Sequence, residues 1–201
     1  MVSTTATPDR LARRARLLAI ATLSWNVIEA AVAIAAGSAA GSIALVGFGL
    51  DSTVEVLSAL VILWQFNSLA KDRERRALRF IALSFFALAA YVVVQAVWDL
   101  VGRTEPVGSP VGIGLAIASL IAMPILAGAK RRTGRAMAST TVIADSNQTK
   151  LCAYLSAVLL GGLLVNATVG WWWADPLAAV GIALLAAKEG HEAWRGETCC
   201  E

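Results

Sequence analysis

Six long runs of apolar residues constrain the fold of this chain more than any other feature. The run from Ser42 to Ala70 is typical, since only Asp51 and Glu55 interrupt it with charge. A helix of roughly 20 apolar residues crosses a hydrocarbon layer about 30 Å thick. The chain is 58% hydrophobic and 15% charged, against about 45–50% and about 25% in soluble domains. The sequence therefore predicts an integral membrane protein.

The apolar runs predict an all-α membrane protein with six transmembrane helices. Each run is long enough to cross a bilayer, and each gap carries charges or the helix breakers Gly, Pro and Asn. We expect a single transmembrane domain over residues 1–201, with no separate soluble domain. The predicted spans cover Leu17–Ala36, Ile43–Leu69, Ala77–Val101, Val111–Ala129, Ala138–Val165 and Trp171–Lys188.

Basic residues mark one side of the predicted membrane domain. Cytoplasmic loops carry an excess of Lys and Arg, and the opposite side of this chain holds only Arg103. We therefore expect both termini in the cytoplasm and a multi-pass protein of the plasma (inner) membrane. Because the cations form short clusters between apolar runs, the net charge of +3 does not indicate a nucleic-acid partner. The expected cytoplasmic cations are Arg10, Arg13, Arg14, Arg16, Lys71, Arg73, Arg75, Arg76, Arg79, Lys130, Arg131, Arg132, Arg135, Lys188 and Arg195.

Several polar side chains lie near the middle of the predicted spans. A charged side chain at that depth costs roughly 2.5–3.5 kcal/mol on insertion scales, so a functional role is the first hypothesis. With a rise of about 1.5 Å per residue, Asp51 and Glu55 lie about 12 and 18 Å below the outer edge, and Cys152 about 21 Å above the inner edge. These depths converge on one central layer. The polar residues concerned are Asn26, Glu29, Asp51, Glu55, Asp145, Gln148, Lys150 and Cys152.

Four of these side chains form a candidate metal site. Four-residue spacings place Asp51 with Glu55, and Gln148 with Cys152, on single helix faces. Zinc accepts thiolate and carboxylate ligands, whereas magnesium and calcium prefer oxygen alone; cadmium, iron and cobalt are further candidates. Carboxylates and thiolates bind metal only when deprotonated. The sequence thus predicts a midplane site at which a divalent metal ion and protons compete, and no other cofactor is expected.

The same residues resemble motifs of the cation diffusion facilitator family. The second span reads SIALVGFGLDSTVE, which places Asp51 and Glu55 at the family's ligand positions, with Glu for the usual Asp. The fifth span reads ADSNQTKLCAYLS where the family has A-D-x-x-H-x-x-x-D-x-x-x-S, so Gln148 and Cys152 replace His and Asp. The stretch WADPLAAVGIALL is similar to the start of the family's sixth span.

The resemblance implies six spans, cytoplasmic termini and export of a divalent cation through spans two and five. It also implies that the chain holds only the family's transmembrane domain, without the cytoplasmic metal-binding domain that contributes to dimerisation in many members. A homodimer of this chain would then be held together by its spans. Gln148 is a weak neutral ligand, whereas Cys152 shifts the expected preference towards softer metals, and Glu29 or Asp145 can supplement the site.

Polar residues around the candidate metal site complete a predicted ion path. Lys150 is expected to balance the charge of Asp145 or Glu29 rather than to bind substrate. A structural alternative stays open, in which Lys150 neutralises Asp51 and Glu55 within a buried ion network. The residues of the predicted ion path outside the metal site are Asn26, Glu29, Asp145 and Lys150.

Two other function classes remain open at the level of sequence. One is a proton-coupled exporter of organic cations, which the buried acids would bind directly. The other is a non-transporting membrane protein that senses metal or binds a partner. An enzyme is not expected, because the chain contains neither HExxH nor G-x-S-x-G. The leading prediction is a secondary transporter that exports a zinc-like divalent cation by proton antiport.

Overall fold

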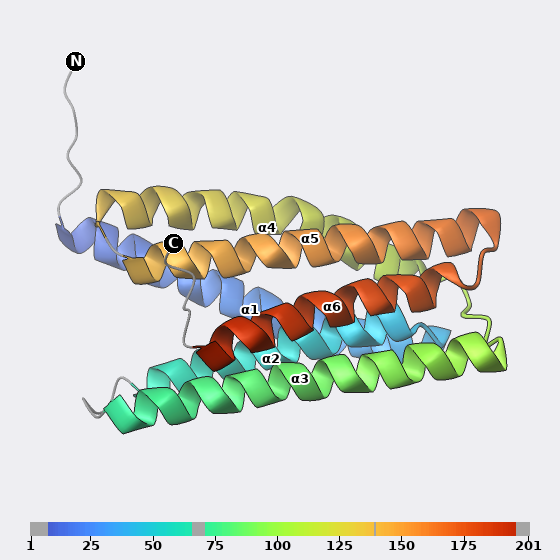
Figure 1. Ribbon diagram of the computed structural model, residues 1–201. Helices are drawn as coiled ribbons and strands as arrows, with labels where there is room; N and C mark the ends of the chain where they lie inside the picture. The colour runs from blue at the N-terminus through green and yellow to red at the C-terminus, as the bar shows by residue number, and fades with distance from the viewer. Residues whose placement is uncertain (1–7, 66–70, 139, 196–201) are drawn as a thin grey trace, which may run out of the picture.

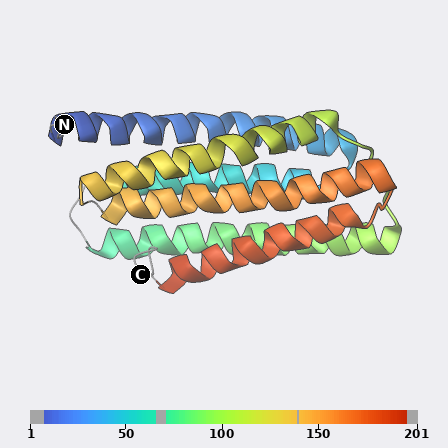
Figure 2. The same ribbon diagram turned by 90° about the horizontal axis from the view of Figure 1, so that it is seen from above.

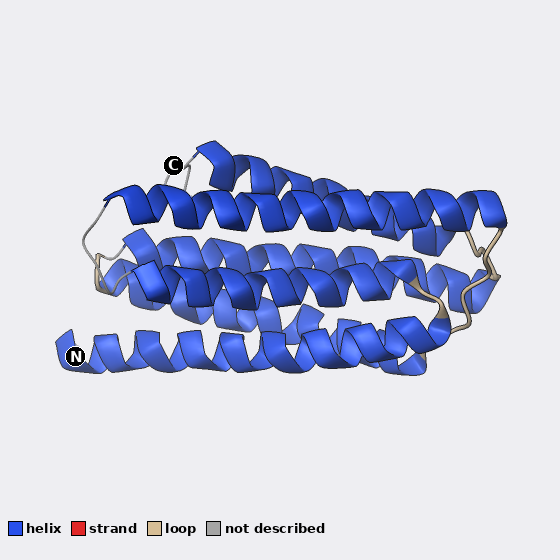
Figure 3. Ribbon diagram, turned by 90° about the horizontal axis from the view of Figure 1, so that it is seen from below, coloured by secondary structure: helices blue, strands red, loops and turns tan. Residues whose placement is uncertain are grey.

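The computed structural model of the chain describes residues 8–65, 71–138 and 140–195, and these form six long α-helices (Figure 1). Within these ranges the secondary structure consists of helices and loops, without a strand (Figure 3). The predicted all-helical fold is therefore confirmed. The helices are α1 (Pro8–Ala40), α2 (Ile43–Gln65), α3 (Lys71–Gly102), α4 (Pro110–Ala136), α5 (Thr140–Val169) and α6 (Ala174–Arg195).

Each helix coincides with one predicted span. The predicted end of the second span, Leu69, lies outside the described residues. Membrane crossing by α2 and α6 stays a prediction. In the described part of the chain, four helices contain a segment long and apolar enough to cross a membrane: Asp9–Ala40, Arg79–Gly102, Pro110–Ala136 and Asp145–Val169.

The start of the sixth helix differs from the prediction. The predicted span begins at Trp171, whereas α6 begins at Ala174, and the three tryptophans precede it. Gly170 has a φ of 70°, a left-handed conformation that glycine adopts without steric cost. The chain therefore turns after α5 instead of passing directly into α6. The rings of Trp171 and Trp173 stack in this connection, with their centroids 4.8 Å apart.

Both termini of the bundle lie at one end. Helix α1 begins and α6 ends at this end, which we call the terminus end (Figures 1 and 2). Arg103 follows α3 at the opposite end of the bundle. The helices thus reproduce the predicted charge asymmetry, and the cytoplasmic orientation of the terminus end remains a prediction. The exposed arginines near the terminus end include Arg10, Arg13, Arg14, Arg16, Arg131, Arg132 and Arg135.

Helix α2 occupies the centre of the bundle. It packs against α1, α3, α5 and α6. One cluster of buried apolar side chains joins Phe48 of α2 to Val92 of α3 and Ile182 of α6. Asp51 and Glu55 follow Phe48 on this central helix, and both are buried. Protein, rather than lipid, therefore encloses the two acids.

Two glycines allow α1 and α2 to approach closely. A Cβ atom at Gly37 would lie 2.7 Å from the backbone nitrogen of Val46. A Cβ atom at Gly49 would lie 2.9 Å from the backbone nitrogen of Ile34. Because backbone atoms cannot move aside as a flexible side chain does, larger residues would push the helices apart. Such small residues permit close helix packing in membranes.

The substitution Gly37→Ala is expected to destabilise the protein by about 1–3 kcal/mol, because the added methyl group overpacks the contact between α1 and α2. Gly114→Ala is the matched control, since a Cβ atom there has nothing within 4 Å and gains the same helix propensity. Thermal unfolding in detergent, followed by circular dichroism, compares the two variants. A midpoint for Gly37→Ala at or above that of Gly114→Ala would contradict the close approach.

Candidate functional site

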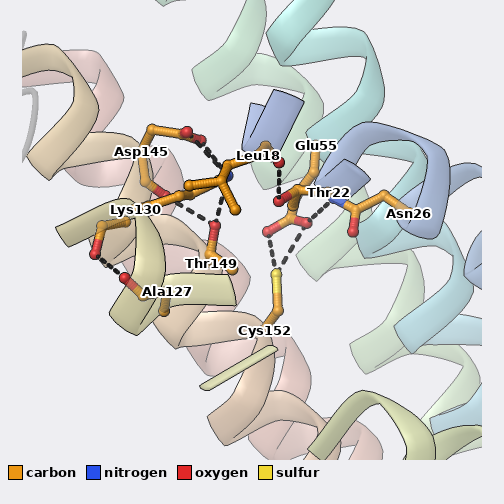
Figure 4. A network of polar contacts seen from close by, with 10 residues as sticks. Leu18, Thr22, Asn26, Glu55, Ala127, Lys130, Asp145, Thr149 and Cys152 are labelled. Atoms are coloured by element: carbon orange, nitrogen blue, oxygen red, sulfur yellow. Dashed lines mark hydrogen bonds and ion pairs between the residues drawn. The ribbon is translucent and has the colours of Figure 1, made fainter. Parts of the chain in front are cut away.

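Glu55 joins three helices at the centre of the bundle. Its Oε2 atom accepts a hydrogen bond from Nδ2 of Asn26 on α1 at 2.7 Å. The thiol of Cys152 on α5 donates to the same carboxylate, with Sγ 2.9 Å from Oε1 and 3.0 Å from Oε2 (Figure 4). All three side chains are buried. The structure thus brings Glu55 and Cys152 together, as their predicted depths require, and metal binding by them stays a prediction.

Asp51 lies one helical turn before Glu55 and faces a small recess between the helices. Its side chain is only 4% exposed. Among the described residues it has neither a hydrogen bond nor an ion pair. Gln148 of α5 and Glu189 of α6 line the recess together with Asp51 and Glu55. The apolar part of the wall consists of Phe85, Leu151, Leu155, Leu185 and Ala186.

The four predicted ligands do not yet converge on a single point. Within the described ranges, no three His, Cys, Asp or Glu side chains are grouped closely enough to hold a metal ion. Asn26 and Cys152 hold the Glu55 carboxylate, while Asp51 faces the recess. The donor types suit a borderline or soft divalent cation, since they combine carboxylates, an amide and a thiol.

Glu29 of α1 belongs to a neighbouring buried network. Its carboxylate accepts a hydrogen bond from Oγ of Ser52 on α2 at 2.9 Å and another from the hydroxyl of Ser119 on α4. The indole nitrogen of Trp25 lies 3.3 Å from Oε1 of Glu29. This network fastens α1 to α2 and α4, which favours a packing role. Beside it, the Oδ1 atom of Asn26 is buried without a hydrogen-bond partner among the described residues.

The buried cation beside the fifth helix is Lys130 rather than Lys150. Lys130 lies within α4, and its Nζ atom is 2.9 Å from Oδ2 of Asp145 and 3.0 Å from Oγ1 of Thr149 (Figure 4). Lys150 is exposed, with Nζ 5.8 Å from the centre of the Tyr154 ring. The prediction that Lys150 balances Asp145 or Glu29 is wrong, because Lys130 pairs with Asp145 and serine hydroxyls donate to Glu29. Residues 145 and 149, one turn apart, face α4, whereas residue 150 points away from it.

Asp51 and Glu55 have no cationic neighbour among the described side chains. Lys130 is the one buried cation of this set, and it is engaged with α5. The charged groups that act on Asp51 and Glu55 are themselves acids, on α1, α2 and α6. Because Lys150 is exposed, the alternative in which it neutralises Asp51 and Glu55 is also wrong. Buried negative charge of this kind favours either protonation or a bound cation.

The sequence prediction missed Glu189, because the predicted sixth span ends at Lys188. Helix α6 continues to Arg195, and Glu189 lines the recess one turn after Leu185. Helical periodicity contains a signal for this residue. Glu189 lies nearly four turns after the buried Asp175 and therefore near the same face of the helix.

Comparison with known proteins relates the chain to membrane proteins of cation efflux. Residues 19–195 match the family described as "Cation efflux transmembrane domain". The magnetosome protein MamB of Magnetospira sp. (strain QH-2) is 28% identical over 167 residues, which cover 78% of this chain and 57% of MamB. The uncharacterized transporter sll1263 of Synechocystis sp. is 26% identical over 182 residues, 85% of this chain and 59% of the relative.

A vertebrate protein shows a similar partial match. Transmembrane protein 163 of Xenopus laevis is 25% identical over 149 residues, which cover 72% of this chain and 53% of the relative. The chain therefore spans somewhat more than half the length of the curated relatives that it matches.

The substitution Asp145→Ala is expected to destabilise the protein more than Lys150→Ala, because it leaves the buried Lys130 ammonium without its carboxylate. The loss should stay below the roughly 3–5 kcal/mol of a fully buried pair, since the Asp145 side chain is 42% exposed. Combining Lys130→Met with Asp145→Ala should restore part of the stability, since no unpaired charge remains. Equal unfolding midpoints in detergent for Asp145→Ala and Lys150→Ala would argue against a stabilising ion pair.

Proposed function

Since the chain belongs to the cation efflux family of cation diffusion facilitators, which it matches over residues 19–195, we propose that it is a secondary transporter of a divalent transition-metal cation. The proposed substrate is zinc or a similar ion, exported from the cytoplasm across the plasma membrane in exchange for protons. The proposed substrate site consists of Asp51 and Glu55 on α2 with Gln148 and Cys152 on α5.

The observation that carries this proposal is that Asp51 is buried without a hydrogen-bond or ion-pair partner among the described residues. This carboxylate lines a recess with a second acid of the same helix. Intramembrane carboxylates normally pair with a cation or with one another, or else mark an ion pathway. Because the neighbouring charges on this site are also acidic, a cationic substrate is the occupant that best satisfies it.

The contact between Cys152 and Glu55 supports proton exchange. A thiol that donates to a carboxylate carries a proton, so this contact and coordination of a metal ion by the Cys152 thiolate exclude each other. Metal binding requires a thiolate and free carboxylate oxygens. An arriving cation would therefore displace the thiol proton and break the contact. Release of the cation on the other side would allow a proton to return to Cys152 and restore it.

The Glu55–Cys152 contact could couple metal binding to the packing of α2 against α5. The Glu55–Cys152 hydrogen bond connects α2 to α5, and the Glu55–Asn26 hydrogen bond connects α2 to α1. If metal coordination replaces the Glu55–Cys152 hydrogen bond, the contact between α2 and α5 changes. Alternating access commonly arises from the rocking of helix bundles around a fixed midplane site. The free Oδ1 atom of Asn26 is available to the cation during this exchange.

The substitution Asp51→Asn is expected to reduce Zn²⁺ flux into proteoliposomes by at least about tenfold, a loss typical even of outer-shell partners in metal sites. Asparagine preserves the size of the side chain and removes its charge. Lys150→Gln is the matched control, because Lys150 is exposed, and it should retain wild-type flux. Unchanged Zn²⁺ flux in Asp51→Asn would eliminate the assigned site. Transport of an organic cation such as ethidium in place of Zn²⁺ would favour the alternative exporter.

The substitution Cys152→Ser is expected to weaken Cd²⁺ binding more than Zn²⁺ binding, because it replaces a soft sulfur ligand by oxygen. Calorimetric titration in detergent measures both affinities. Affinity of the wild-type protein should fall as the pH falls, by about tenfold per pH unit for each proton that the metal displaces. The serine variant should release one proton fewer. An unchanged ratio of Cd²⁺ to Zn²⁺ affinity would show that Cys152 does not ligate the metal.

A further inference from the structure

The acidic lining of the recess extends beyond the four predicted ligands to a third helix. Glu189 of α6 shares the recess with Asp51, Glu55 and Gln148. In Figure 1, α6 runs beside α2 and α3 towards the terminus end. The recess is thus bounded by carboxylates from α2 and α6, with apolar side chains between them.

Close packing of α6 on α3 fixes the position of Glu189. A Cβ atom at the adjacent Gly190 would lie 3.1 Å from Cβ of Phe85 and 3.2 Å from the carbonyl oxygen of Ala82. Phe85 also forms part of the recess wall. The missing side chain at residue 190 therefore lets α6 approach α3 at the level where the preceding glutamate meets the recess.

The charged neighbours of Glu189 on its own helix are Lys188 and Glu192. The adjacent Lys188 is 63% exposed, and its Nζ atom lies 3.7 Å from Oε1 of Glu192 on the same helix. No hydrogen bond or ion pair of Glu189 occurs among the described residues. Glu189 acts as a like charge on the buried, unpartnered Asp51 across the recess. Two such carboxylates repel each other unless a cation lies between them.

Glu189 lies closer to the terminus end than Asp51 does, and at about the level of Glu55. A Cβ atom at Gly47 of α2 would lie 3.1 Å from Val92 and 3.9 Å from Ile182 of α6, so these residues share one level of the bundle. Glu189 is seven residues, about 10.5 Å, from Ile182 towards the terminus end, whereas Asp51 and Glu55 are four and eight residues, about 6 and 12 Å, from Gly47 in the same direction. If the terminus end faces the cytoplasm, as the charge asymmetry predicts, a cation that enters from the cytoplasm meets Glu189 before it meets Asp51.

We propose that Glu189 is a further cation-binding residue, which binds the divalent metal ion in the recess together with Asp51 and Glu55. This assignment rests on the proposed transport function and adds a third helix to the substrate path. It also gives α6 a direct role in metal capture, separate from the ligands on α2 and α5.

Calorimetric titration of the full chain in detergent with Zn²⁺ tests this role independently of transport. Glu189→Gln is expected to weaken Zn²⁺ binding by about five- to tenfold, because one attractive charge is lost from the recess. Glu189→Asp should retain most of the affinity, since the charge remains. Glu192→Gln is the matched control: it is the same substitution one turn along α6, at a residue outside the recess lining, and should bind as the wild type does.

Measuring Zn²⁺ flux into proteoliposomes distinguishes metal binding by Glu189 from Zn²⁺ transport by the protein. In wild-type protein that transports Zn²⁺, Glu189→Gln should raise the KM for Zn²⁺ offered at the cytoplasmic face with little change in maximal rate. Equal Zn²⁺ affinity in the wild type, Glu189→Gln and Glu192→Gln would overturn the role of Glu189 and leave the transporter intact. A wild type without flux, but with affinity that depends on Glu189, would overturn transport and retain Glu189 as a metal ligand.

Discussion

A carboxylate among apolar side chains requires a hydrogen-bond donor or a cation, and the bundle is arranged around this requirement. Donors or a lysine satisfy Glu29, Glu55, Asp145 and Asp175. Asp51 and Glu189 differ from these residues, because neither has such a partner within the described ranges and both line the recess. The protein therefore satisfies most of its buried acids internally and leaves negative charge where a mobile cation can supply the missing partner.

The paired acids also explain how the helices are held together. Lipid is as apolar as the helix surfaces, so association in the membrane depends on close packing and on interhelical hydrogen bonds. Glu29 links α1 to α2 and α4, and Asp175 of α6 accepts hydrogen bonds from the hydroxyl of Ser42 and the N–H of Ala44 at the start of α2. These contacts locate α2 at the centre, while Asp51 and Glu189 line the recess without such partners among the described residues.

Membership of the cation efflux family is compatible with the unusual ligand positions of this chain. Where the resemblance places His and Asp, the chain has Gln148 and Cys152. The structure shows that Cys152 still reaches an acid of α2, since its thiol contacts Glu55. Gln148 still borders the recess. Because the donors at these positions include a thiol, we propose a site for borderline or soft metal ions.

The sequence by itself determined the six helices and the charge asymmetry between the two ends, because hydrophobic runs and helical periodicity are local properties. The apolar runs and the helical spacing of the polar residues also predicted that α2 and α5 meet near Glu55 and Cys152. Only the tertiary structure decided which partner each polar group takes. Lys130 pairs with Asp145 where Lys150 was expected, and Glu189 reaches the recess from α6. Periodicity fixes the face of a helix on which a residue lies, whereas helix packing decides which neighbour that face meets.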